Sequence, residues 1–280
     1  MALFVVLALS ALSALGSTLG SGAFGTLAWL WVLPLSFVGS FLGLLLLMGL
    51  VVVIMALTVP MHKPQAKDDP VFRWVIHFAV SLLIPLLGIR LHTKGLENTP
   101  ENGRVFLVSN HISDIDPAVL LHCFPKNKFA FISKKENEKK PIIGQFLHRI
   151  MCQSVNREND REALKTILNC IRLIKEDEVS IGVFPEGRIY PDRKLHTFRS
   201  GVFKIPQKTN VPIMVCTLQN TCKVIPNFLR LKPTDVHVHL LAVLQPEDFK
   251  NLSTVDLGSR IYEMMAQDLG PDLVSQEDAG

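Results

Sequence analysis

The chain has 280 residues, of which 48% are hydrophobic and 19% charged, so it has room for one medium-sized catalytic domain and an anchor but not for two large domains. The formal net charge of +4 is small, and with an apolar N-terminal segment it argues against nucleic-acid binding. The five cysteines are scattered and form no C-x-x-C pair, which favours reduced thiols in a cytosolic compartment over disulfides or a zinc site.

Residues 1–61 contain no Asp, Glu, Lys, Arg or His side chain. Because roughly 20 apolar residues suffice to cross a bilayer, this segment predicts a transmembrane anchor of one or two helices. The stretch 27–59 is the stronger candidate, whereas residues 2–15 could form a second span, a re-entrant segment or a signal-peptide core. Lys63 and Lys67 follow the apolar stretch, which predicts an integral membrane protein whose remaining chain lies on the cytoplasmic side.

Residues 62–94 are interpreted as a linker to the catalytic part of the chain. Within it, residues 71–91 form an apolar stretch that His77 and Pro85 interrupt, so it is marginal as a membrane span. We interpret this stretch as an amphipathic helix in the membrane interface, and a core helix of the soluble domain is the alternative.

From residue 95 to residue 269, short apolar runs alternate with segments of helical periodicity, and residues 270–280 are expected to form a flexible tail. Strands are expected at 105–109, 129–132, 154–155, 179–184, 212–217 and 236–243. Helices are expected at 117–123, 141–151, 160–174, 201–208 and 254–269. The predicted fold is therefore α/β, a mixed sheet flanked by helices and preceded by N-terminal transmembrane helices.

The segment richest in chemical groups follows the first expected strand, where His111 precedes Asp116 by five residues. Acylation of an alcohol requires a base to remove the hydroxyl proton, and histidine suits this role because its pKa lies near neutrality. A carboxylate on the other ring nitrogen holds the tautomer and stabilises the imidazolium. On its own the pattern is weak, because Asp116 followed by Pro117 is also an ordinary helix start.

A second segment, Phe184-Pro185-Glu186-Gly187-Arg188, follows another expected strand. Its glycine allows close approach of the backbone, and its arginine has a planar fork that matches phosphate oxygens. An ordinary turn with an ion pair is the alternative interpretation of this segment taken alone.

Four blocks in this order resemble the glycerolipid acyltransferase family, which includes the 1-acylglycerol-3-phosphate acyltransferases. They are Asn110-His111 with Asp116-Pro117, Ser154-Val155-Asn156-Arg157, Phe184-Pro185-Glu186-Gly187-Arg188 and Val211-Pro212-Ile213. In the third block Arg188 directly follows the glycine, whereas the family's common form places arginine one position later.

The resemblance implies that His111 deprotonates the acceptor hydroxyl and that Asp116 orients it. It also implies that Arg157 and Arg188 hold the acceptor phosphate, in a pocket that Glu186 and Gly187 shape. The implied reaction moves an acyl group from acyl-CoA or an acyl-carrier protein, as co-substrate, to the hydroxyl of 1-acylglycerol 3-phosphate, with no metal and no bound cofactor. The alternatives are another lysophospholipid or an amino-acid-derived lipid as acceptor, a membrane-anchored lipid hydrolase, and a non-catalytic lipid-binding protein.

Two further features have an ordinary and a functional interpretation. Six lysines between Lys126 and Lys140 could form a solvated face or contact anionic lipids or an acidic donor. His237 and His239 lie on the same face of an expected strand, where a polar surface is favoured over a metal site.

Overall fold

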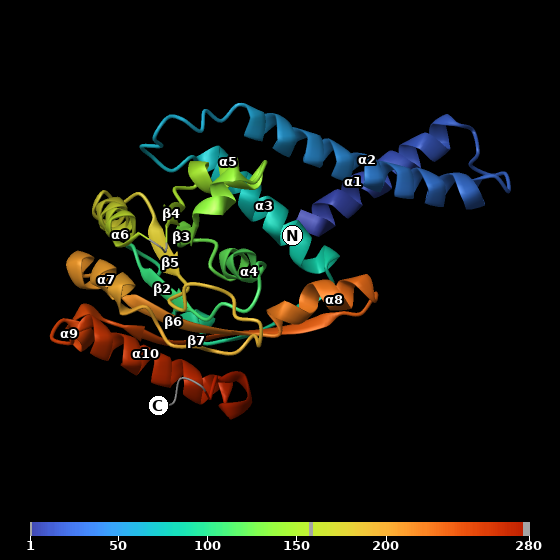
Figure 1. Cartoon of the computed structure of the whole chain (residues 1–280). Helices are drawn as coiled ribbons and strands as arrows, with labels where there is room; N and C mark the ends of the chain where they lie inside the picture. The colour runs from blue at the N-terminus through green and yellow to red at the C-terminus, as the bar shows by residue number, and fades with distance from the viewer. Residues whose placement is uncertain (1, 157–158, 277–280) are drawn as a thin grey trace.

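The computed structural model describes residues 2–156 and 159–276, and these residues form an α/β domain from which a pair of helices projects (Figure 1). The described residues form a seven-stranded sheet in the order β1-β7-β6-β2-β5-β3-β4. Its strands are β1 (Ile89–Lys94), β2 (Phe106–Ser109), β3 (Phe129–Lys134), β4 (Gln153–Val155), β5 (Ser180–Val183), β6 (Ile213–Gln219) and β7 (Thr234–Leu244). Neighbouring strands are parallel except β6 and β7, so the predicted mixed sheet is confirmed.

Helices cover both faces of the sheet, which explains why its central strands read as continuous apolar runs rather than alternating ones. Along β2, Phe106 and Val108 belong to one hydrophobic core, while Leu107 belongs to the other. The first core contains side chains of α6 (Asp160–Lys175), α7 (Lys204–Thr209) and α10 (Thr254–Leu269). The second contains side chains of α3 (Pro70–Leu86), α4 (Asp116–Cys123) and α8 (Val224–Leu229).

The N-terminal helices α1 (Ala2–Gly20) and α2 (Trp29–Leu57) are long and apolar enough to cross a membrane by length and composition. They pack against each other, and the Ser40 hydroxyl donates to the Ser13 hydroxyl at 2.9 Å. Ala2 and Val6 of α1 also pack against Leu82 of α3, which joins the pair to the rest of the molecule.

Helix α3 shows features of both interpretations of its sequence. Val80 and Ile84 lie in the core of the domain, as in an ordinary core helix. Val71 and Trp74, in contrast, expose 60% and 65% of their surface, as expected for a helix with an outward apolar face. The helix therefore lies between the apolar pair and the sheet.

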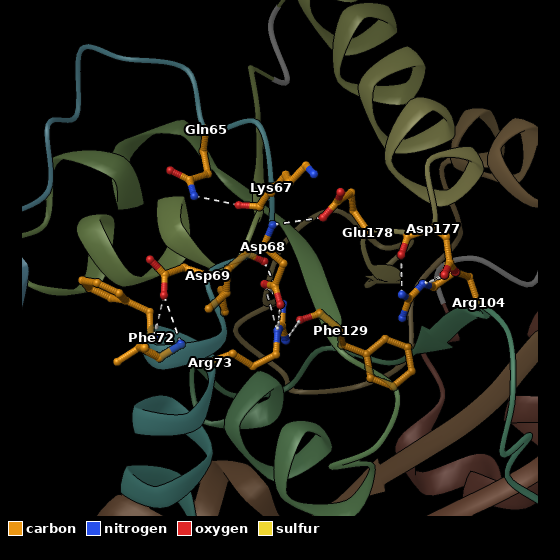
Figure 2. Close-up of polar contacts among 12 residues, drawn as sticks. Gln65, Lys67, Asp68, Asp69, Phe72, Arg73, Arg104, Phe129, Asp177 and Glu178 are labelled. Carbon is orange, nitrogen blue, oxygen red and sulfur yellow. Dashed lines mark hydrogen bonds and ion pairs between the residues drawn. The ribbon is translucent and has the colours of Figure 1, made fainter.

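A buried ion pair fastens the start of α3 to the domain (Figure 2). Asp68 and Arg73 lie 2.7 Å apart with side chains only 6% exposed. The guanidinium of Arg73 also donates to the carbonyl oxygens of Phe129 on β3 and Ile150, each at 3.0 Å. The backbone N–H of Asp68 donates to the Glu178 carboxylate at 3.2 Å, so the chain leaving α2 is held against the domain.

Three segments differ from the sequence-based expectation. Residues 89–94, assigned to the linker, form β1 and pair with β7, so the sheet begins before residue 95. In the segment expected to be a flexible tail, the N–H of Ser275 donates to the Leu195 carbonyl at 2.9 Å. Residues 221–229 and 246–249, for which no helix was expected, form short helices, including α8 and α9 (Pro246–Phe249). These elements are short or lie at an edge, where local periodicity carries little signal.

Candidate active site

The first three sequence blocks meet at one edge of the sheet. Strands β2, β5, β3 and β4 lie side by side and run in the same direction, so the loops after all four leave from the same edge. We call this the carboxyl edge, and β6 also ends there because it is parallel to β2. Loops at this edge are where sites usually form in open α/β sheets. The fourth block begins β6 and therefore lies at the opposite edge.

Asp116 is the first residue of α4 and its side chain is fully buried. Its Oδ2 atom accepts hydrogen bonds from the backbone N–H groups of Ile112 at 2.7 Å and Ser113 at 2.8 Å. Its Oδ1 atom accepts a hydrogen bond from the Thr221 hydroxyl at 2.5 Å. Each of these partners can donate to a carboxylate oxygen, so together they fix the position of the Asp116 side chain.

His111 and Asp116 form the pair that the sequence predicts, with Nδ1 of the imidazole 2.9 Å from Oδ2 of the carboxylate. Since the carboxylate acts as an acceptor, Nδ1 carries the proton in the neutral imidazole and Nε2 keeps its lone pair. Nε2 has no hydrogen-bond partner within residues 2–156 and 159–276, and the side chain is 17% exposed. The ring can therefore take a proton from a bound molecule.

One face of the His111 imidazole stacks on aromatic rings. The ring of His111 lies 4.2 Å from that of Phe184, and Phe184 lies 5.7 Å from Phe131 on β3. Gly182 on β5 makes room for this stack, because a Cβ atom there would stand 2.5 Å from the Phe131 ring. The stack limits rotation of the imidazole and so fixes the direction of Nε2.

Glu186 contacts protein backbone rather than solvent. It is 2% exposed, and its carboxylate accepts from the N–H of His111 at 2.8 Å and from the N–H of His196 at 3.3 Å. Burial raises the pKa of Glu186 to about 8, although these two donors act in the opposite direction. These contacts support a positioning role, in which Glu186 connects the loop that carries His111 to the loop after β5.

Gly187 has the left-handed φ of +78° that the turn after Glu186 requires. The next residue, Arg188, is exposed, and its guanidinium lies 4.4 Å from the Tyr190 ring centre. Tyr190 stacks on His196 at 3.6 Å, and His196 pairs with Asp192 at 3.0 Å. A stacked guanidinium still has its N–H edge available for an anion.

Two cavities border the loops of this edge. One of about 300 Å³ is lined by Asn110 and Ile112, on either side of His111, and by cationic side chains that include Arg193 and Lys223. Another of about 460 Å³ borders β4 and includes Asn156 in its lining. The predicted ligand Arg157 follows Asn156 and lies outside the described residues.

Sequence reasoning missed several residues of this site. Thr221 orients Asp116 although the two are 105 residues apart in the chain. Phe131 and Gly182 were not singled out, and neither was Arg193, which donates to the Ile112 carbonyl at 3.0 Å. Asn220-Thr221, just after β6, is a weak sequence signal for Thr221. The sequence carries no signal for Phe131, Gly182 or Arg193.

Several other reactive groups among the described residues are buried or paired. All five cysteines are unpaired, and burial raises the pKa of Cys123 to about 12 and that of Cys152 to about 11, which disfavours thiolates. His239 pairs with Asp268 at 3.0 Å, and His237 stacks on His92. Across residues 2–156 and 159–276, no three His, Cys, Asp or Glu side chains gather as metal ligands would.

The fold and site define an α/β protein with a histidine–aspartate pair at the carboxyl edge of its sheet. Comparison with known proteins agrees with this description. Residues 90–219 match the family model described as Acyltransferase. A 1-acyl-sn-glycerol-3-phosphate acyltransferase of Borreliella burgdorferi is 28% identical over 63% of this chain and 72% of the relative.

A further relative, a 1-acyl-sn-glycerol-3-phosphate acyltransferase of Limnanthes alba, is 26% identical over 69% of this chain and 68% of its own length. The crystal structure of the 1-acyl-sn-glycerophosphate acyltransferase of Thermotoga maritima shares the fold, with a TM-score of 0.61, 22% identity and coverage of 79% of this chain and 86% of that one. Residues 90–219, just under half of the chain, therefore resemble the acyltransferases, and the relatives that match over about two thirds of the chain are acyltransferases as well.

The raised pKa of Glu186 predicts a pH dependence of stability. Its folded-state pKa of about 8 exceeds the ordinary value of 4.5, so the folded state holds a proton that the unfolded state loses between these values. Stability from this group is therefore complete below about pH 4.5 and declines as pH rises toward 8, by at most about 1.4 kcal/mol per pH unit. Glu186→Gln should remove this slope.

Thermal unfolding in detergent between pH 5.5 and 8.5 would test this, as the difference between wild type and Glu186→Gln. The variant also loses one backbone contact, which lowers its stability by an amount that does not depend on pH. Parallel pH curves for the two proteins would contradict the prediction.

Proposed function

We propose that the protein transfers a fatty acyl group from an acyl thioester to the free hydroxyl of 1-acylglycerol 3-phosphate, forming phosphatidate in phospholipid synthesis. The observation that carries this proposal is the His111–Asp116 pair, whose imidazole Nε2 has no hydrogen-bond partner among the described residues and lies at an edge shared with the loops after β3, β4, β5 and β6. The names of the relatives from Borreliella burgdorferi and Limnanthes alba support the choice of acceptor.

In the proposed step, Nε2 of His111 accepts the hydroxyl proton as the acceptor oxygen attacks the thioester carbonyl. A new ester bond forms, the carbon–sulfur bond breaks, and the proton on His111 passes to the departing thiolate. Asp116 keeps Nδ1 protonated and stabilises the imidazolium between these events. The donor is acyl-CoA or an acyl-carrier protein, and the step requires no metal or bound cofactor.

Arg188 and Arg157 are the proposed ligands of the acceptor phosphate. Arg188 supports this role because it is exposed, its guanidinium lies 4.4 Å from the Tyr190 ring centre, and it makes no hydrogen bond within the described part of the chain. Glu186 and Gly187 set the course of the loop that presents it. The role of Arg157 rests on its position in the second block alone.

The helices α1 and α2 are proposed to anchor the protein in the membrane, with the catalytic domain on the cytoplasmic side. Their length and composition support this, and Ala56 is the one side chain of α2 that the rest of the described protein buries. Lys63 and Lys67 after α2, together with five unpaired cysteines, support the cytoplasmic side.

Acyl transfer from labelled acyl-CoA and labelled acyl-carrier protein to a panel of lysolipids would test the proposal. We expect transfer to lysophosphatidate, and Arg188→Met should raise KM for that acceptor about tenfold, as expected for loss of a charge-assisted hydrogen bond, without changing KM for the donor. Preference for a zwitterionic lysolipid would overturn the acceptor assignment. Release of free fatty acid at the same rate without any acceptor would indicate a hydrolase instead.

A further inference from the structure

A short apolar surface at the carboxyl edge is not used by the proposed chemistry. On α8 and in the turn after it, Ile225 and Phe228 expose 46% and 41% of their surface, while Leu229 and Leu231 expose 75% and 92%. We call these four residues the apolar tip. Single exposed apolar residues are ordinary, but four within seven positions form a patch of the kind that marks an interaction site.

The turn that carries Leu231 is rigid and strained. The N–H of Lys232 donates to the Asn227 carbonyl and the N–H of Leu231 to the Phe228 carbonyl, each at 2.9 Å, which is the Schellman arrangement. In this arrangement Leu231 has a left-handed φ of +53°, where glycine is preferred. Asn227 also donates to the Thr234 hydroxyl at 3.1 Å and holds the turn against β7.

Leu231 is therefore unfavourable in water on two counts, its backbone conformation and its nearly complete exposure. Transfer of the side chain into an apolar environment would offset both. A rigid turn that presents a leucine in this way is suited to insertion, because no further ordering of the backbone is required when the leucine leaves water.

The charged side chains within the segment that carries the apolar tip, residues 222–234, are all basic. Lys223, Arg230 and Lys232 are exposed, and no acidic residue occurs between residues 222 and 234. Segments that lie in a membrane interface place apolar side chains at the boundary of the acyl chains and basic side chains among the headgroups. Each lysine or arginine near an anionic lipid surface adds to the attraction.

The apolar tip is also continuous with the part of the molecule that holds the anchor. The N–H of Thr234 donates to the carbonyl of Gly88 at 3.0 Å, so the tip adjoins the C-terminal end of α3. There Leu83 and Leu86 are 40% and 36% exposed, and the neighbouring Leu82 packs against α1. Figure 1 shows α8 and the end of α3 on the side of the domain toward which α1 and α2 project.

We propose that the apolar tip is a second bilayer contact, inserted into the anionic leaflet that holds the anchor; this rests on the proposed membrane anchoring. The contact begins at Ile225, four residues after Thr221, whose hydroxyl orients Asp116. Insertion of the tip therefore holds the carboxyl edge, with His111, against the lipid surface where a lipid acceptor resides.

Photocrosslinking of the full-length protein in native membranes tests the proposal. The photoreactive residue p-benzoylphenylalanine is placed at Leu231, at Leu46 in the exposed part of α2, or at Asn210, which has a similar left-handed φ of +51° at the end of α7. We expect radiolabelled phospholipid to be captured at positions 231 and 46 and not at position 210.

Crosslinking at positions 231, 46 and 210 distinguishes the proposed bilayer contact of the apolar tip from the proposed membrane anchor. Lipid capture at 46 without capture at 231 would overturn the bilayer contact and leave the anchor standing. Capture at neither position would overturn both, and capture of a protein at 231 would replace the bilayer by a protein partner. None of these outcomes depends on acyl transfer.

A functional variant complements the crosslinking. In Leu229→Ser/Leu231→Gly, glycine relieves the strained turn while both leucines are lost, so thermal stability should be retained. Transfer to long-chain lysophosphatidate in vesicles should fall on the order of tenfold, as expected when a leucine no longer leaves water. Transfer to a short-chain, monomeric acceptor should be unchanged, and Asn210→Gly should match wild type with both acceptors. Equal loss on both acceptors, or loss on neither, would overturn the proposal.

Discussion

Replacing His111 with alanine is expected to lower the rate of acyl transfer by about 10²–10⁴-fold, the usual contribution of a general base. The imidazole is held by Asp116 at 2.9 Å and by the ring of Phe184 at 4.2 Å, and alanine has no group that can accept the hydroxyl proton. The loss should appear in kcat, with KM for acceptor and donor nearly unchanged, since the imidazole acts mainly in the transition state. Initial rates in membranes with equal amounts of protein would measure it.

A milder substitution at the same site tests whether the lost activity of His111→Ala is caused by unfolding. Thr221→Val removes one hydrogen bond from the Asp116 carboxylate but leaves the imidazole in place, so we expect a loss of about tenfold, the value of a hydrogen bond to a charged group. Thr221→Ser keeps the hydroxyl and should recover the rate. Wild-type rates in His111→Ala would show that the proposed base is wrong.

Replacing Arg73 with alanine is expected to lower the free energy of unfolding by about 3–5 kcal/mol, the range seen when one member of a buried ion pair is removed. The guanidinium pairs with Asp68 at 2.7 Å (Figure 2) and donates to the carbonyl oxygens of Phe129 and Ile150. Its loss therefore leaves one buried carboxylate and two buried carbonyl oxygens without their donor. Arg73→Lys should recover only part of the stability, because an ammonium cannot reproduce the planar fork.

Thermal unfolding in detergent would measure this, at about 2–4 °C per kcal/mol for a chain of this size. The matched control is Arg172→Ala, which breaks the exposed pair of Arg172 with Glu176 at 2.5 Å and should change stability by about 0.3–0.5 kcal/mol. Equal shifts for the two variants would contradict the assignment of Arg73 as a buried tether. Asp68 lies in the segment between α2 and α3. We therefore also expect that loss of this pair weakens the attachment of α1 and α2 to the domain.

The elements with a clear local pattern were predicted well. The helix expected at 160–174 is observed as α6, Asp160–Lys175, and the helix expected at 254–269 is observed with those bounds. Their apolar side chains recur at helical spacing, which is a property of neighbouring residues and is visible without a partner. The predicted mixed sheet is also confirmed, and the apolar segment that was predicted to form one or two helices forms two.

The contact between His111 and Asp116, the proposed catalytic pair, was also predictable from the sequence, because the two residues are five positions apart in one strand-to-helix loop. Glu186 was identified as part of the site, but its role was not, since only the fold shows that its carboxylate contacts the backbone of His111 and His196. Arg188 was found exposed, as a phosphate ligand should be, and Arg157 lies outside the described residues.

The sequence by itself determined the order of elements, the apolar N-terminal segment and the His111–Asp116 pair, because each depends on the spacing of nearby residues. Only the tertiary structure decided which strands lie side by side, and with them the approach of Thr221 to Asp116, the stack beneath His111 and the position of the fourth block at the far edge. Parallel strands meet through long connections, so their pairing is set by the packing of the whole sheet and leaves no short-range pattern.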